Sequence, residues 1–329
     1  MKPVIAITIG DFNGIGPEVA LKAAIHPSVR SKCTPLLVGP LNVFQNTLSA
    51  LRLKVPLQKA AAILQKGTAI PVVDVGDGIW ADVEYGKPTK SSGKTAGAAI
   101  EAAVGLCISG KVQAMVTAPA SKEALNIAGY NFPGQTEMIA LLSRSSRVAM
   151  MLVSKEMRIG LVTIHVPVRT IAEHVTSGKI VEKMAIIRDS LLRDFRVTDP
   201  KLAVLGLNPH AGEHGVIGNE EQTIILPAVE EARKQGIPVD GPFPADGFFG
   251  DKAYKRYDAV VAMYHDQGLI PLKMSSFGKA VNFSAGLNII RTSPDHGTAY
   301  DIAGKGKARI ESMLEAIRLA MMIARNRHD

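Results

Sequence analysis

Three histidines each follow directly after a short apolar run that predicts a buried strand. They are His165 after residues 159–164, His210 after 203–207, and His265 after 259–263. Ligands of open α/β sheets bind beyond the carboxyl ends of the strands, where three imidazoles can converge in one crevice. A catalytic divalent ion takes three protein ligands and keeps a position open for substrate. The pattern predicts a metal site; the alternative is three loop histidines, each bonded to a backbone carbonyl.

The spacing of the histidines does not name the metal. Imidazole suits Zn, Co, Ni or Fe, and added carboxylates or water admit Mg or Mn. Asp246, in PFPADGFF, and Asp266, beside His265, are expected near the same face. Each would orient an imidazole from outside the ligand set. The alternative for each is a turn or capping aspartate.

Lys273, Asn282 and Arg291 lie between the third histidine and a glycine-rich segment. A lysine point charge with a forked arginine forms a good clamp for phosphate or carboxylate. The alternative is that these are solvated surface cations. Thr136 and Glu137, in FPGQTEM, open a predicted helix and have a simpler interpretation as caps.

Two glycine-rich segments are candidates for binding an anion or a cofactor. The first, residues 9–18, lies between a predicted strand and helix, and it lacks the Lys-Ser/Thr of a P-loop. The second, residues 296–308, contains His296, Gly297 and Thr298, and its Asp301 is able to accept bonds from ribose hydroxyls. No GxGxxG motif follows the first strand, so the ordinary Rossmann fingerprint is absent.

The elements that must position these residues alternate between strand and helix along the chain. Strands are expected at 4–9, 35–38, 112–117, 149–153, 159–164, 203–207 and 259–263. Helices are expected at 17–25, 43–51, 94–109, 181–195, 220–235 and 310–325. Met313, Ile317, Met321 and Ala324 share one face of the last helix. This order predicts mostly parallel sheets with helices on both faces.

Bulk composition limits the classes of function. The chain has 329 residues, long enough to split into two domains, with boundaries expected near 130 and 285. Its formal charge of +8 is scattered, which favours small anionic ligands over nucleic acid. Cys33 and Cys107 are expected to be free thiols. The first apolar run is too short for a signal peptide or a membrane span, so we expect a cytoplasmic protein with no membrane partner.

Several long motifs resemble the 4-hydroxythreonine-4-phosphate dehydrogenases of pyridoxal phosphate biosynthesis. They are GDFNGIGPE, VTAPASKEAL, FPGQTE, IHVPV, GLNPHAGEHGVIGNEE, PFPAD, AMYHDQGLIPLK, VNFSAGL and IIRTSPDHGTAYDIAGKG. The similarity runs almost from end to end. The GIGPE and HGTAxDIAGKG motifs are also similar to isocitrate and isopropylmalate dehydrogenases. This implies an α/β fold of two α/β/α domains with a cleft between them, residues 1–130 plus 285–329 and residues 131–284, in a homodimer.

Carried over position by position, the resemblance makes the three histidines ligands of one divalent ion (Zn, Mg or Co), in a site completed across the dimer interface. It assigns substrate binding to Lys273, Asn282, Arg291 and Thr136. At Gln135 the family usually has histidine, which leaves the exact substrate open. Gln135 would bind substrate weakly, reflect a different substrate, or only cap the helix that follows it.

The implied reaction oxidises the C3 hydroxyl of 4-phosphooxy-L-threonine with NAD (or NADP), and the β-keto acid then loses CO2. Lys273 would act at the catalytic centre, and Asp246 is the candidate general base. Three alternatives stay open. The first is a dehydrogenase of threonate or erythronate phosphate. The others are a β-decarboxylating dehydrogenase of the isocitrate type and a phosphate acyltransferase on a related fold.

Overall fold

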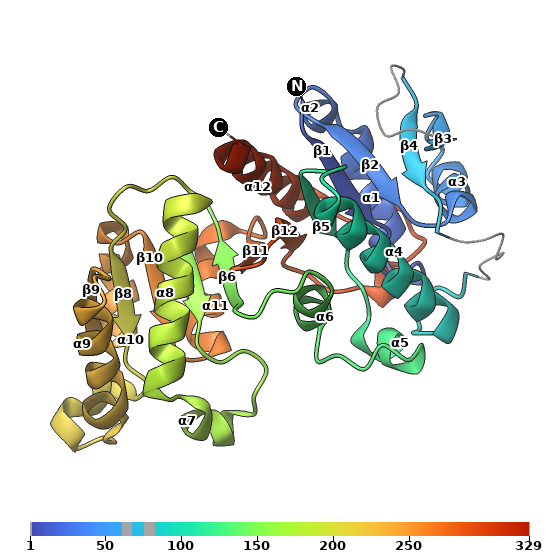
Figure 1. Ribbon diagram of the computed structural model, residues 1–329. Helices are drawn as coiled ribbons and strands as arrows, with labels where there is room; N and C mark the ends of the chain where they lie inside the picture. The colour runs from blue at the N-terminus through green and yellow to red at the C-terminus, as the bar shows by residue number, and fades with distance from the viewer. Residues whose placement is uncertain (1, 61–67, 76–82, 329) are drawn as a thin grey trace. The chain divides into compact units, whose positions relative to one another are not determined.

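The computed structural model describes residues 2–60, 68–75 and 83–328, and it divides into two compact units (Figure 1). Unit 1 comprises residues 1–146 and 287–328, and unit 2 comprises residues 147–286. The first boundary lies beyond residue 130 because α6 (Gln135–Leu142) packs on α4 (Lys90–Ile108) of unit 1. Asn288 also ties the segment after α6 to unit 1, since its backbone N–H donates to Ser145 Oγ at 2.9 Å.

The strands of unit 1 are all parallel, as the alternating pattern predicts. In sheet order they are β3 (Leu57–Lys59), β4 (Ile70–Val73), β2 (Thr34–Val38), β1 (Val4–Thr8), β5 (Ala114–Thr117) and β12 (Arg291–Pro294). Strand β1 reads VIAIT and is buried at every position, as expected of a strand covered on both faces. Strands β3, β4 and β12 are not among those that the sequence pattern predicts.

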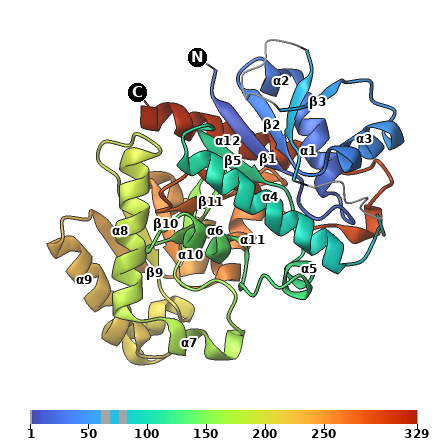
Figure 2. The same cartoon turned by 45° about the vertical axis from the view of Figure 1, so that its right-hand side comes forward.

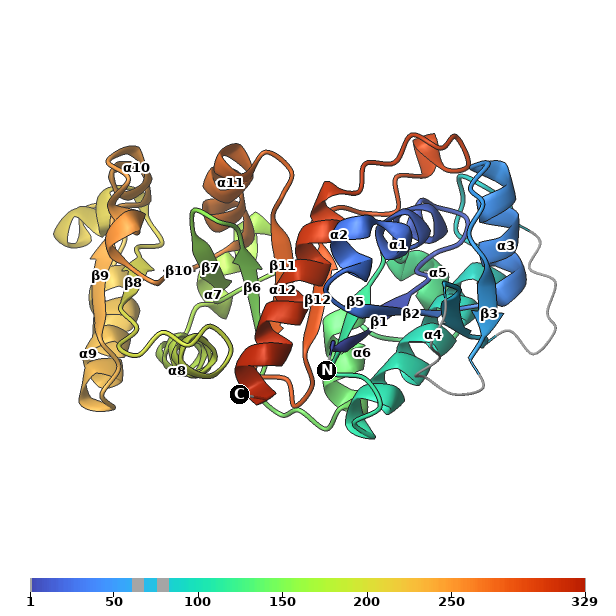
Figure 3. The same cartoon turned by 90° about the horizontal axis from the view of Figure 1, so that it is seen from above.

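Helices cover both faces of this sheet (Figures 2 and 3). Those of unit 1 are α1 (Gly16–Ile25), α2 (Pro27–Arg30), α3 (Leu41–Ala50), α4, α5 (Lys122–Ile127), α6, η5 (Tyr300–Ile302) and α12 (Glu311–His328). Helices α1 and α12 pack together, while α4 packs with α5 and α6. The predicted face of α12 is confirmed, since Met313, Ile317, Met321 and Ala324 are buried.

Unit 2 departs from the parallel arrangement on one side of its sheet. In order its strands are β11 (Val281–Ala285), β6 (Ala149–Val153), β7 (Arg158–Leu161), β10 (Ala259–Ala262), β8 (Leu202–Leu205) and β9 (Val239–Phe243). Strand β6 is antiparallel to both β7 and β11. The link of residues 154–157 is a tight turn, too short for the crossover that a parallel pair needs.

Helices lie on both faces of the unit 2 sheet, with α8 and α11 on opposite sides (Figure 3). They are η1 (Val168–Thr170), α7 (Ile171–His174), α8 (Ser177–Arg193), η2 (Pro209–Gly215), η3 (Glu221–Ile225), α9 (Leu226–Lys234), α10 (Ala245–Gly250), η4 (Ala253–Arg256) and α11 (His265–Ser276). The helix expected at 220–235 begins with a single π-type turn, η3, before α9.

One hydrophobic cluster of unit 2 lies between its sheet and α11. Ile159, Leu161, Val260 and Ala262 from the strands pack with Leu269 of the helix. This burial fixes α11, which begins directly after β10 and therefore presents His265 at the carboxyl edge of the strands.

Two further expectations are addressed by the described residues. Cys33 and Cys107 are free cysteines, as predicted, and burial raises the pKa of both thiols to about 12. Among the described helices, none has the length and apolar character needed to cross a membrane.

Candidate active site

Two of the three predicted histidines lie beside each other at the carboxyl edge of the unit 2 sheet. Strands β7 and β10 are parallel and pair Leu161 with Ala262, so the chain leaves both at the same edge. Backbone bonds continue this register, and Thr163 Oγ1 donates to the Met263 carbonyl at 2.7 Å. The rings of His165 and His265 are consequently 5.8 Å apart between centroids.

Asp266 orients the His265 ring. Its carboxylate Oδ1 lies 2.7 Å from His265 Nδ1, which leaves Nε2 as the ring's free coordinating atom. This contact goes beyond the alternative interpretation, in which Asp266 is only a turn or capping residue. Two neighbouring imidazoles, one held by a carboxylate, are a donor set that fits a divalent transition ion.

The third histidine is not grouped with the other two. His210 follows β8 as predicted, but it stands in the η2 turn, whose residues 210–214 all have positive φ. Across the described residues, no group of three or more His, Cys, Asp or Glu side chains is arranged to hold a metal ion. This left-handed turn could not be predicted from residue types, because only one of its five residues is glycine.

The other predicted residues of unit 2 are spread over three elements. Asp246 is exposed in the first turn of α10, whose cap Pro244 makes no side-chain bond, and α10 packs on η2. Lys273 is exposed on α11, further along the helix that begins at His265. Asn282 lies on β11, and its buried Oδ1 has no hydrogen-bond partner.

In unit 1, Arg291 is not a surface cation. It starts β12 with a relative exposure of 3%, and its Nε and Nη2 donate to Thr117 Oγ1 at 3.1 and 2.7 Å. Its Nη1 donates to Thr136 Oγ1 at 3.3 Å. Burial lowers the pKa of Arg291 to about 10, with Glu137 acting in the opposite direction, so the guanidinium stays charged at neutral pH. Thr117, which ends β5 in the VTAPA motif, had not been singled out.

Gln135 and Thr136 open α6, but neither caps it. The N-cap is Gly134, which makes no side-chain bond, so the capping interpretation of both residues is wrong. The Gln135 Oε1 atom is buried and has no hydrogen-bond partner. An acceptor in this position is costly unless a ligand supplies a donor.

The two glycine-rich segments, treated separately in the sequence, are joined in the structure. Tyr300 Oη donates to Asp11 Oδ2 at 2.7 Å, and the Ile15 backbone N–H donates to the Thr298 carbonyl at 2.9 Å. Gly14 permits this approach, because a Cβ there would stand 2.6 Å from that carbonyl oxygen. Residues 296–302 are therefore held against the turn that begins α1.

Asn13 connects a third segment, residues 84–89, to the two glycine-rich segments. Its Nδ2 donates to the Lys87 carbonyl at 3.1 Å and to Thr89 Oγ1 at 3.0 Å, and its Oδ1 accepts from the Glu84 backbone at 2.8 Å. Of the residues predicted for cofactor binding, His296 has a buried Nε2 without a partner. Gly297 and Asp301 are exposed.

Comparison with known proteins decides the family. The family profile described as pyridoxal phosphate biosynthetic protein PdxA matches residues 31–320. The chain belongs to the PdxA family. Its PdxA relatives include a 4-hydroxythreonine-4-phosphate dehydrogenase of Trichlorobacter lovleyi, 42% identical over 332 residues and covering 99% of each chain. A D-threonate 4-phosphate dehydrogenase of Cupriavidus necator is also 42% identical, over 330 residues, covering 99% of this chain and 98% of the relative.

A solved PdxA-family structure agrees with the fold. The 4-hydroxythreonine-4-phosphate dehydrogenase of Klebsiella pneumoniae matches with a TM-score of 0.89 at 37% identity, covering 98% of each chain. The predicted α/β class and the family resemblance are both confirmed. The chain is a dehydrogenase, an oxidoreductase, and its PdxA family implies a nicotinamide cofactor.

Proposed function

We propose that this chain oxidises the C3 hydroxyl of 4-phosphooxy-L-threonine with NAD, in pyridoxal 5′-phosphate biosynthesis. C3 loses a hydride to NAD and its hydroxyl loses a proton to a base. The 3-keto acid then loses CO2, and C2 takes up a proton to give 3-amino-2-oxopropyl phosphate. One observation carries the proposal. Gln135 Oε1, Asn282 Oδ1 and His296 Nε2 are buried polar atoms without protein partners, and all three belong to residues predicted to bind substrate or cofactor.

The residues of unit 1 suit an anionic substrate that also carries a hydrogen-bond donor. Arg291 is a buried cation held in place by Thr117 and Thr136, and a fixed guanidinium fork suits a phosphate or carboxylate group. Gln135 Oε1 would accept a bond from a substrate hydroxyl, which is a neutral contact. An amino acid phosphate offers both features.

The residues of unit 2 offer a second polar set. Lys273 supplies an exposed point charge of the kind that binds phosphate, and Asn282 supplies a buried amide oxygen. Binding energy from the phosphate would hold C3 in a fixed position for hydride loss. We assign Asp246 as the base that accepts the hydroxyl proton. Its helix, α10, packs on the turn that carries His210.

His165, His210 and His265 would hold the divalent ion (Zn, Co or Mg). Such an ion lowers the pKa of a ligating water from 15.7 to about 7, and a comparable effect on the alcohol would ease its ionisation. Asp266 would keep the His265 ring turned toward it.

We also propose that a second copy of the chain completes the metal site. The described residues of one chain hold no group of three ligands, and α11, which carries His265 and Lys273, also exposes apolar side chains. These are Ile270 at 56%, Met274 at 72% and Phe277, just after the helix, at 82% exposure. Sedimentation should give a dimer that Met274→Lys weakens and Leu141→Lys, at an exposed site on α6, does not; a wild-type monomer would refute the proposal.

We assign cofactor binding to residues 296–301 and to the turn that begins α1, against which they are held. His296, Gly297 and Thr298 would contact the nicotinamide end, and the exposed Asp301 would accept bonds from the ribose hydroxyls. A 2′-phosphate beside this carboxylate would be repelled, which favours NAD over NADP.

A second substrate is favoured by one specific observation. A relative with equal identity is named for D-threonate 4-phosphate, and the resemblance implies histidine at the position of Gln135. D-Threonate 4-phosphate carries a hydroxyl instead of the ammonium group and is also able to donate to Gln135 Oε1.

Comparing NADH formation from both substrates, with NAD and NADP and with and without chelator, tests the proposal. We expect the highest kcat/KM for 4-phosphooxy-L-threonine with NAD, and loss of activity with chelator. A higher kcat/KM for D-threonate 4-phosphate would select the second substrate. Acyl phosphate formation without any NADH would instead indicate the phosphate acyltransferase alternative.

A further inference from the structure

The turn that carries His210 has an unusual backbone. His210, Ala211, Gly212, Glu213 and His214 have φ of 52°, 50°, 78°, 42° and 56°. Left-handed backbone brings Cβ close to the following carbonyl oxygen, so consecutive non-glycine residues in it are strained. Such a turn persists only where its surroundings impose it.

The Glu221 carboxylate bonds to the chain just before this turn. This side chain is buried, at 3% relative exposure, where η3 begins. Its Oε1 accepts from the backbone N–H groups of Leu207 and Asn208, both at 2.7 Å. Its Oε2 accepts from Asn208 Nδ2 at 2.9 Å. Three donors therefore converge on one carboxylate immediately before the turn begins.

Two glycines are packed against the same carboxylate. A Cβ on Gly206 would stand 3.1 Å from Glu221 Oε1, and a Cβ on Gly212 would stand 2.5 Å from Oε2. The carboxylate is thus enclosed between the end of β8 and the middle of the turn. Asn208 adds a second anchor, because its Nδ2 also donates to Glu220 Oε2 at 2.7 Å.

We propose that Glu221 is a positioning residue that fixes the left-handed turn and so holds in place His210, which would be a ligand of the divalent ion. The inference rests on the proposed metal role of His210. Glu221 would act through the backbone of Leu207 and Asn208, which it binds, and of Gly212, against which it packs. The GLNPHAGEHGVIGNEE motif then has a physical basis, since its first half forms the turn and its last residue holds it.

The test is Zn²⁺ titration by calorimetry of the metal-free full-length chain. Glu221→Gln keeps the volume of the side chain but replaces one acceptor oxygen with an NH₂ group that conflicts with the Asn208 donor. His210→Ala should abolish one Zn²⁺ site. In Glu221→Gln we expect the Kd of that same site to rise about 10–100-fold, and excess metal to restore kcat. Glu231→Gln is the matched control; this exposed α9 residue accepts from Gln235 at 2.8 Å and should leave the Kd unchanged.

Amide exchange gives a readout that does not depend on metal. The Leu207 and Asn208 amides should exchange faster in Glu221→Gln than in the wild type, while the amides of β8 stay protected. If Glu221→Gln does not fold, Asn208→Ala replaces it with the same expected direction, since it removes only the side-chain donor. A folded variant with wild-type Zn²⁺ affinity and exchange overturns the role of Glu221. A wild-type chain that binds no Zn²⁺ overturns the metal proposal with it.

Discussion

The phenol of Tyr300 donates a 2.7 Å hydrogen bond to the buried carboxylate of Asp11, across 289 positions of sequence. Burial, together with the Asp11 carboxylate, raises the pKa of Tyr300 to about 12, so the phenol remains a donor at neutral pH. This bond joins the proposed cofactor segment to the turn that begins α1. The conformation of the proposed cofactor segment therefore depends on the packing of unit 1.

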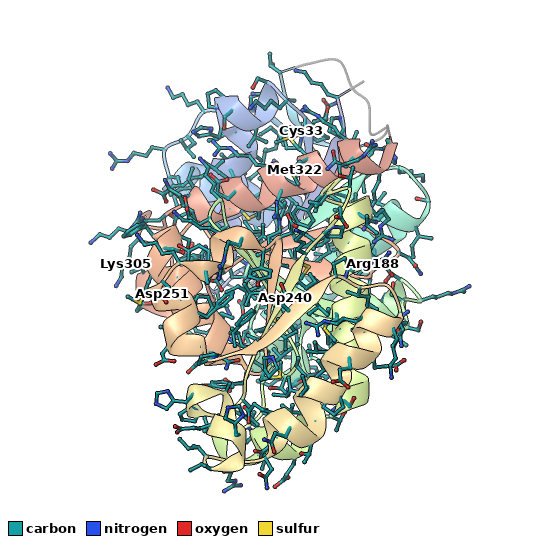
Figure 4. All side chains as sticks on the ribbon, turned by 90° about the vertical axis from the view of Figure 1, so that its left-hand side faces the viewer. Cys33, Arg188, Asp240, Asp251, Lys305 and Met322 are labelled. Carbon is teal, nitrogen blue, oxygen red and sulfur yellow. The ribbon has the colours of Figure 1, made fainter. Side chains whose placement is uncertain are left out.

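Tyr300→Phe should raise KM for NAD about 3–30-fold, because hydrogen bonds to charged groups are worth about 1.5–3 kcal/mol and part of that loss reaches the cofactor segment. KM for the phosphorylated substrate should not change. The matched control is Tyr257→Phe in unit 2, whose hydroxyl donates to Asp240 (labelled in Figure 4) at 3.1 Å. Equal changes in both KM values, or none, would contradict the predicted role of this bond.

The stability of the fold should depend on the ionisation of Asp11. Burial raises the pKa of Asp11 above its usual 3.8, although bonds from Tyr300 and Asn13 act in the opposite direction. The folded chain then binds this proton more tightly than the unfolded chain, so stability falls as pH rises through the folded pKa. The Asp11→Asn variant has no ionisable group at this position, so its stability should not fall in this way.

Urea unfolding of wild type and Asp11→Asn over a pH series measures the effect. The variant loses an acceptor and is expected to be less stable at low pH, but the difference should narrow as pH rises from below 3.8 toward neutrality. A difference that widens over the same range would mean that the folded chain lowers the pKa of Asp11.

Arg291→Lys should raise KM for the phosphorylated substrate about 10–100-fold. Lysine keeps the charge but cannot make the forked contacts with Thr117 and Thr136 that hold the guanidinium in place. KM for NAD should stay near its wild-type value. Arg309→Lys, at a residue with an 80% exposed side chain, is the control, and an Arg291→Lys enzyme that behaves like it would remove Arg291 from the binding site.

Gln135→His should lower KM for 4-phosphooxy-L-threonine about 3–30-fold, since a charge-assisted contact is worth about 1.5–3 kcal/mol against about 1 for a neutral one. The substitution restores the residue of the family pattern at the start of α6. Steady-state kinetics of the single variant gives the result. An unchanged or higher KM would indicate that Gln135 is matched to a different substrate, such as D-threonate 4-phosphate.

Local pattern predicted much of the fold and part of the site. The proximity of His165 and His265 follows from the ends of adjacent parallel strands, and the apolar runs located β7 and β10 to within a few residues. Strand β6 was predicted at its observed position, 149–153, but its antiparallel direction was not, although the short polar link before β7 was the signal for it. Such a link excludes a helical crossover on length alone.

Three features of the site had no local signal. The left-handed turn at His210 uses ordinary residues, and the carboxylate bonded just before it belongs to Glu221, which lies outside the turn. The Tyr300–Asp11 bond joins distant segments, and neither residue is marked by its neighbours. Thr117 ends a strand and becomes a partner of Arg291 only when β5 and β12 pair. Each depends on tertiary contacts, which propensity and periodicity do not contain.

The central claim is that oxidation of a phosphorylated hydroxy acid requires a divalent ion held by the strand-end histidines. The most direct measurement is NADH formation from 4-phosphooxy-L-threonine by metal-stripped wild type and His210→Ala, before and after reloading with Zn²⁺, Co²⁺ or Mg²⁺. We predict no activity before reloading, recovery in the wild type alone, and an unchanged circular dichroism spectrum in the variant. Activity of reloaded His210→Ala within twofold of the wild type would contradict the claim.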